Sequence, residues 1–164
     1  MATAGKNLSA FDPTQFNNCA DFRIGIVVSE WNGHITERLL DGALEVLRQI
    51  GHKSQHLSIT RVPGAFELPL GAQHYASQDT YDGVVAIGVV IQGETKHFDF
   101  VCSGTTQGIM DVMLKYNKPV GFCVLTDNNE QQSLDRAGGQ HGNKGTEAMV
   151  AVLQMIQIQK GLRS

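Results

Sequence analysis

The stretch YDGVVAIGVVIQGETKHFDF, residues 81–100, decides the fold class of this chain. Its first part, 81–91, is a nearly continuous run of apolar and β-branched residues, which is typical of a strand buried on both faces of a sheet. After Gly93 the period changes, and residues 98–116 present one apolar helical face. A buried strand that leads directly into a helix is the repeating unit of a parallel α/β sheet.

The same alternation continues outward in both directions along the chain. Further strands are predicted at 22–28, 56–59 and 120–125, and further helices at 35–50, 63–76, 131–137 and 148–156. Right-handed crossovers place such helices on both faces of the sheet. The sequence therefore predicts a three-layer αβα sandwich with a four-stranded parallel, flavodoxin-like sheet, and function at the carboxyl ends of the strands, near a switch point in strand order.

The length of 164 residues fits one domain, which we place at 22–164. Residues 1–21 are polar, with only scattered apolar residues, so this segment has little with which to fold alone. We expect an N-terminal arm that is ordered only against a partner.

Composition narrows the class of protein further. The net charge of −3 offers no electrostatic footprint for nucleic acid. No apolar run has the length of a signal peptide or a membrane span, and three cysteines without metal-like spacing fit a reducing compartment. A cytoplasmic protein without nucleic-acid or membrane partners is expected.

The sequence contains no complete motif for binding a metal ion or a nucleotide. Residues 94–97 fit the Glu-x-x-His pattern of di-iron carboxylate proteins, but that chemistry needs a second copy, which the sequence lacks. HExxH, GxxxxGK[ST] and a GxGxxG after a strand are also absent. We therefore predict neither a metal ion nor a redox cofactor.

Trp31 is the only tryptophan and directly follows the first predicted strand. A broad aromatic ring at the carboxyl end of a parallel strand suits a stacked heteroaromatic ligand. The alternative is a tryptophan that caps the end of the sheet or packs on a neighbour, and the residue by itself does not decide between them.

Residues 93–97 follow the longest strand and open a helix, so backbone N–H groups, a hydroxyl and the positive end of the helix dipole converge there. A phosphate would fit there. The same residues also fit an ordinary helix start, with Thr95 as N-cap and Asp99 in the first turn. His97 favours a functional interpretation, because a helix N-terminus disfavours imidazolium and leaves a neutral ring that can pass protons.

Arg136 and Lys144 flank a glycine-rich connection whose backbone can approach an anion closely. Arg136 would clamp a phosphate bidentately. Without other signals, the simpler interpretation of Arg136 is a cation at a helix C-terminus that interacts with the negative end of the helix dipole. The nearby Lys144 favours an anion site.

Three blocks occur in order along the chain: VPGAFELP at 62–69, GETKHFD at 93–99 and RAGGQHGNKG at 136–145. In order and spacing they resemble the lumazine synthase family, from about residue 22 to residue 153. This resemblance implies a transferase that condenses 5-amino-6-(D-ribitylamino)uracil with 3,4-dihydroxy-2-butanone 4-phosphate. The products are 6,7-dimethyl-8-ribityllumazine, phosphate and water, formed in riboflavin biosynthesis without a metal or redox cofactor.

The resemblance also implies roles for particular residues. The catalytic pair would be His97 for proton transfer and Arg136 for phosphate, with Lys144 in support. The substrate-binding matches are Trp31 and Asn32 for the pyrimidine, Ala65, Phe66 and Glu67 for the ribityl chain, Val89, Val90 and Ile91 for the pyrimidine pocket, Glu94 and Thr95 on the phosphate side, and Phe122 from a neighbouring subunit.

The resemblance further implies active sites between adjacent subunits of a homopentamer. Twelve pentamers form an icosahedral shell in some members of the family, and riboflavin synthase is the further partner that the resemblance suggests. The short 138–145 connection resembles that of shell-forming members. Two stretches depart from the family pattern, namely 127–131, which is commonly Thr-rich, and the polar, flexible 103–105. Neither stretch contains His97 or Arg136.

Two other functions stay open on the sequence. A ligand-binding or shell protein that lost turnover would share the fold and pocket, although the intact His97, Arg136 and Glu67 argue against it. An unrelated phosphosugar enzyme on a flavodoxin-like fold would share the architecture. It would not predict the ordered blocks.

Overall fold

The computed structural model describes residues 10–16 and 18–163. Its central sheet has four parallel strands in the order β2-β1-β3-β4: β1 (Ile24–Ser29), β2 (Leu57–Val62), β3 (Gly83–Ile91) and β4 (Val120–Asp127). Both inner strands are almost wholly buried, as their uninterrupted apolar runs predict. The expected parallel α/β sheet is confirmed.

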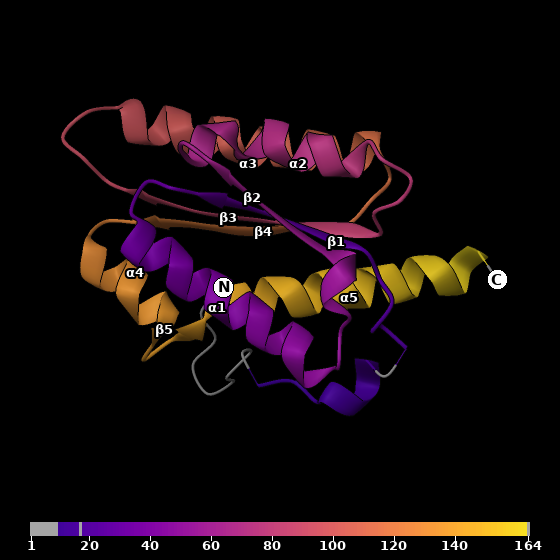
Figure 1. The fold of residues 1–164 in the computed structure, drawn as a ribbon. Coiled ribbons are helices and arrows are strands. Elements are labelled where there is room, and N and C mark those ends of the chain that lie inside the picture. Colours follow the sequence, from indigo (N-terminus) through magenta and orange to yellow (C-terminus); the bar gives the residue numbers. More distant parts are fainter. Residues whose placement is uncertain (1–9, 17, 164) are drawn as a thin grey trace.

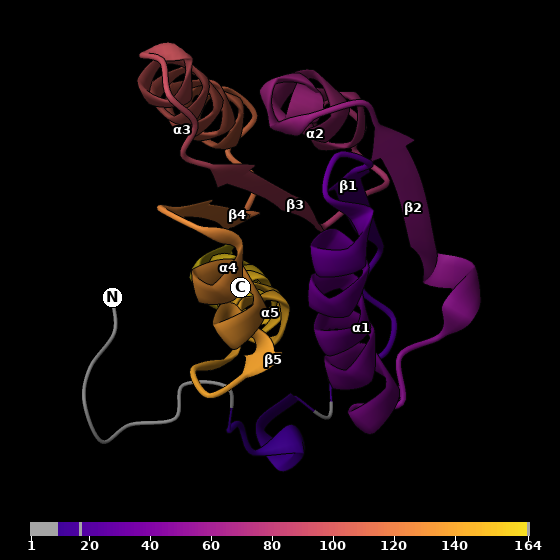
Figure 2. The ribbon, with the colours of Figure 1, turned by 90° about the vertical axis from the view of Figure 1, so that its left-hand side faces the viewer.

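Helices cover both faces of this sheet (Figures 1 and 2). One face carries α2 (Leu68–Ala76) and α3 (His97–Lys115), and the other carries α1 (Gly33–Gln49), α4 (Glu130–Arg136) and α5 (Lys144–Arg163). Each side has its own apolar core, in which β-strand residues pack against the helices. The predicted three-layer αβα sandwich is confirmed.

Several element bounds differ from the sequence prediction. Strand β2 runs to Val62 rather than to residue 59. The prediction stopped short because β2 is an edge strand in which Thr60 and Arg61 are polar and exposed. A 3-10 turn, Ala65–Glu67, precedes α2, so that Pro69 falls in the first turn of the helix, where a missing N–H costs nothing. Helix α5 is much longer than the predicted 148–156.

Part of the segment predicted as a partner-dependent arm packs on the chain's own core instead. A 3-10 turn spans Pro13–Phe16, and both Phe16 and Cys19 are buried in the core beneath α1 and α5. Gln157 of α5 donates hydrogen bonds to the Gln15 carbonyl and to Asn18. The prediction is wrong for these residues, because their few apolar side chains suffice to anchor them; residues 1–9 and 17 lie outside the described part of the chain.

The switch point in strand order lies between β1 and β3, whose crossovers leave in opposite directions. The connections after β1, β2, β3 and β4 all emerge at the carboxyl edge of the sheet. A short antiparallel pair, β5 (Ala137–Gly139) and β6 (Gly142–Asn143), links α4 to α5 and was not predicted. Among the described residues, no helix is long and apolar enough to cross a membrane.

Candidate active site

A cavity of about 790 Å³ lies at the carboxyl ends of β1 and β3, and we call it the carboxyl-edge cavity. Ten of the predicted site residues line it: Trp31, Asn32, Ala65, Phe66, Glu67, Val89, Val90, Ile91, Thr95 and His97. These residues come from three segments of the chain: the turn after β1, the turn after β2, and the end of β3 with the start of α3. The fold therefore brings most of the predicted site together at the switch point.

Trp31 enters the cavity because of the turn that follows β1. The backbone N–H groups of Glu30 and Trp31 donate to the carbonyls of Val62 and Pro63, which continue the pairing of β1 with the β2 side. Asn32 then adopts a left-handed conformation, with φ of 57°, and starts α1. The indole is 74% exposed, so within this chain it does not pack as a cap on the sheet.

The Ala65–Glu67 turn forms a second wall of the cavity, and α3 holds it in place. The buried hydroxyl of Thr105 donates to the Ala65 carbonyl at 3.1 Å. Glu67 Oε2 accepts the Gly64 N–H at 2.9 Å, which fixes the carboxylate beside the turn. The Phe66 ring is 60% exposed and lies against Gly104.

The start of α3 supplies the third wall. Thr95 and His97 line the cavity, whereas Glu94 does not. The structure places the N-cap at Lys96 without a side-chain hydrogen bond, and Thr95 Oγ1 accepts only a long 3.4 Å bond from the His97 N–H. The alternative of an ordinary helix start had Thr95 as N-cap and Asp99 in the first turn. The structure contradicts the first of these placements and confirms the second.

Of the other predicted residues, all except Glu94 lie in a second cavity, of about 500 Å³, along the free edge of the sheet, which we call the β4 cavity. Phe122, Arg136 and Lys144 line it, and none of its lining residues lines the carboxyl-edge cavity. Phe122 is 44% exposed on β4. One chain thus carries two separate groups of predicted site residues.

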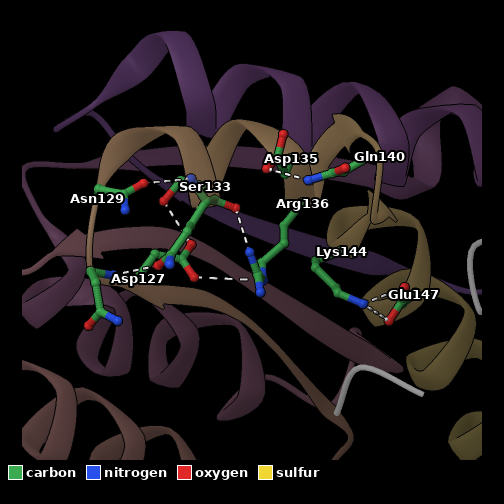
Figure 3. Close-up of polar contacts among 10 residues, drawn as sticks. Asp127, Asn129, Ser133, Asp135, Arg136, Gln140, Lys144 and Glu147 are labelled. Atoms are coloured by element: carbon green, nitrogen blue, oxygen red, sulfur yellow. Dashed lines mark hydrogen bonds and ion pairs between the residues drawn. The ribbon is translucent and has the colours of Figure 1, made fainter. Parts of the chain in front are cut away.

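Both cations of the β4 cavity have acidic neighbours (Figure 3). Arg136 Nε lies 3.7 Å from Asp127 Oδ1, and its Nη1 donates to the Gln132 carbonyl at 2.8 Å. Lys144 Nζ lies 2.7 Å from Glu147 Oε1. Arg136 thus does satisfy a carbonyl in the last turn of α4, and it also faces the cavity.

Sequence reasoning missed several members of both cavities. Phe98, Phe100 and Val101 line the carboxyl-edge cavity because the first turns of α3 lie over it. Asp127 and Glu147 line the β4 cavity beside the two cations, and only the unusual composition of 127–131 signalled the first of them. Cys123 also lines the β4 cavity, but burial raises the pKa of its thiol to about 12, so it is no ready nucleophile.

Fold and site together define the class: a flavodoxin-like α/β protein whose ligand cavity lies at the strand ends beside the switch point. Residues 21–160 match the family of 6,7-dimethyl-8-ribityllumazine synthase. The chain belongs to this family, and it is therefore an enzyme.

Individual relatives agree with the family match. Proteins named 6,7-dimethyl-8-ribityllumazine synthase from Flavobacterium johnsoniae and Christiangramia forsetii are 55% and 53% identical to this chain. Each alignment covers 98% of this chain, with 84% of the first relative and 96% of the second. A relative of the same name from Desulfovibrio desulfuricans is 42% identical over 85% of this chain and 90% of its own length.

Proposed function

We propose that this enzyme condenses 5-amino-6-(D-ribitylamino)uracil with 3,4-dihydroxy-2-butanone 4-phosphate to give 6,7-dimethyl-8-ribityllumazine, phosphate and water. The reaction would serve riboflavin biosynthesis in the cytoplasm. The observation that carries the proposal is the gathering of Trp31, the 65–67 turn, the end of β3 and His97 around one cavity in a chain of this family.

The shape and chemistry of the carboxyl-edge cavity suit the pyrimidine substrate. The exposed indole of Trp31 offers a face for stacking, and the apolar end of β3 at 89–91 forms a floor beneath a flat ring. The Glu67 carboxylate and the backbone of the 65–67 turn supply hydrogen-bonding groups for the ribityl hydroxyls. Each feature matches one part of the proposed substrate.

In the proposed mechanism the ring amine attacks the ketone carbonyl to give an imine with loss of water, and phosphate then leaves by elimination. The resulting enol tautomerises, and its carbonyl group is attacked by the ribitylamino nitrogen, which closes the second ring with loss of water. His97 moves protons between these steps, and Arg136 stabilises the leaving phosphate. Most of the acceleration comes from holding the two substrates together.

The site is proposed to form between two copies of the chain. Phe122, Arg136 and Lys144 line a cavity on the free β4 edge, separate from the one that holds His97. A neighbouring copy that sets its β4 cavity against the carboxyl-edge cavity would complete the site. We propose a homopentamer, with an icosahedral shell of twelve pentamers and enclosed riboflavin synthase as the larger assembly.

A spectroscopic assay with both substrates tests the proposal by the absorbance of the lumazine product. We expect Arg136→Ala to lower kcat/KM roughly 1,000-fold and His97→Ala roughly 100-fold, the losses typical of an anion-stabilising donor and of a general acid–base group. Arg48→Ala and His74→Ala remove exposed residues of the same types and should leave turnover unchanged. An assembled protein that forms no lumazine would refute the proposal and favour a ligand-binding role.

A further inference from the structure

Asp127, the last residue of β4, carries a carboxylate that is fixed at the edge of the β4 cavity. The residue is only 8% exposed. Ser133, which is fully buried, donates its hydroxyl to Asp127 Oδ2 at 2.8 Å. The Asp127 carbonyl also accepts the Gln92 N–H, so both the backbone and the side chain are held.

The helix that carries Arg136 is anchored to the same corner. Asn129 caps α4 by accepting the Gln132 N–H at 3.0 Å, and the Gln132 side chain accepts the Asn128 N–H at 2.9 Å. Gln132 also receives the Arg136 Nη1 hydrogen bond through its carbonyl. Asp127 Oδ1 therefore faces a guanidinium whose position is set from two sides (Figure 3).

A carboxylate in this position has two opposite effects on an anion site. It attracts Arg136 and keeps the side chain at the cavity, but it repels a phosphate that binds to the same guanidinium. Lys144 is paired with Glu147 in the same cavity, so the formal charges of the two cations are balanced before any anion arrives. Such a site holds phosphate more weakly than a bare pair of cations.

We propose that Asp127 is a positioning residue that acts as the resident counter-ion of Arg136 and weakens the binding of inorganic phosphate, so that the phosphate product leaves readily. The proposal rests on the proposed function, because it takes Arg136 as the phosphate ligand. Asp127 does not line the carboxyl-edge cavity, which is proposed to hold the pyrimidine. Its effect passes through the guanidinium.

The affinity of the assembled protein for inorganic phosphate, measured by isothermal titration calorimetry, tests this directly. Asp127→Asn removes the charge and keeps an oxygen that can accept the Ser133 bond. We expect this variant to bind phosphate at least about fivefold more tightly than wild type, since removing one negative charge near Arg136 strengthens its field at the anion. In turnover assays it should show a correspondingly lower inhibition constant for phosphate.

Asp135→Asn is the matched control. Asp135 precedes Arg136 in the sequence, but its carboxylate accepts hydrogen bonds from Gln131 and Gln140 and points away from the guanidinium (Figure 3). The same change of charge at this partly exposed position should alter phosphate affinity by less than about twofold. Asp127→Ser is a second variant that removes the charge if Asp127→Asn does not assemble.

Each outcome separates the two hypotheses. One result would overturn the counter-ion role and leave the proposed function intact: Arg136→Ala loses phosphate binding, and Asp127→Asn binds phosphate no more tightly than wild type. Wild-type protein that shows no Arg136-dependent phosphate binding would overturn the phosphate role of Arg136, and the present proposal with it. A merely structural role for Asp127 could not tighten phosphate binding.

Discussion

At the scale of single residues, Trp31 offers the most direct test of substrate binding in the carboxyl-edge cavity. We expect Trp31→Ala to raise the KM for the pyrimidine substrate roughly 5- to 150-fold, because stacking on a base is worth about 1–3 kcal/mol. Trp31→Phe keeps an aromatic face and should stay within about threefold of wild type. Equal losses in both variants would show that the indole acts by something other than stacking.

His52 makes the stability of the fold depend on pH. Its Nε2 lies 2.7 Å from the Phe22 carbonyl, which can only accept, and burial lowers the pKa of the imidazole below its ordinary 6.5. The unfolded chain therefore binds a proton at a higher pH than the folded one. This contribution to stability is present above pH 6.5 and is lost as the pH falls below that value.

We expect the free energy of unfolding of wild type, measured with urea, to fall between about pH 7.5 and about pH 5.5. The fall should be smaller in His52→Gln. The carboxyls with lowered pKa values, such as Asp21 and Asp135, titrate below this window. His74→Gln, at an exposed histidine, should keep the wild-type dependence. An unchanged slope in His52→Gln would contradict the assignment.

At the scale of elements, the packing of α3 on the 65–67 turn links the fold to the site. A Cβ at Gly104 would lie 2.7 Å from Phe66 Cε2, and one at Gly108 would lie 2.8 Å from Pro69. The glycines cost α3 helix propensity, and they let the turn that faces the ligand approach the helix closely.

Gly104→Ala should therefore affect binding more than stability. Alanine gains about 1 kcal/mol of helix propensity, which offsets much of the steric cost, and the exposed Phe66 ring can move aside. We expect a melting temperature near that of wild type and a KM for the pyrimidine raised several-fold. Gly161→Ala, where a Cβ meets nothing within 4 Å, should leave KM unchanged; the hypothesis fails if the two variants behave alike.

Patterns along one element predicted the fold well. The apolar run at 83–91 and the heptad-like face of α1 identified their elements, because local period and burial agree there. The extent of β2 was underestimated, since an edge strand carries polar residues such as Thr60 and Arg61. The packing of Phe16 was missed, because no local pattern reveals that a short turn will find a place on a distant core.

Most of the candidate site was predictable from the sequence, and the family resemblance already assigned Phe122 to a neighbouring subunit. Trp31, the 65–67 turn and His97 each follow a recognisable change of element, so their meeting at the carboxyl edge follows from the topology. The partners of the two cations were not predictable. Whether Asp127 and Glu147 face Arg136 and Lys144 depends on how α4 and α5 pack against β4, and sequence spacing does not encode that.

At the scale of the whole molecule, the separation of the two cavities leads us to expect that a single chain is inactive. The carboxyl-edge cavity holds His97, and the β4 cavity holds Arg136 and Lys144. In a closed ring of identical copies, every carboxyl-edge cavity can be completed by a β4 cavity. This is because a head-to-tail contact sets one cavity of each chain against the other cavity of its neighbour. We therefore propose that neighbouring chains share each active site in this way.

Complementation between two defective variants tests that claim most directly. Trp31→Ala/His97→Ala disables the carboxyl-edge cavity, and Arg136→Ala disables the β4 cavity. Mixed assemblies obtained by co-expression should recover about a quarter of wild-type activity, because one in four random contacts joins two intact halves. Activity no higher than the mean of the two separate variants would contradict a shared site.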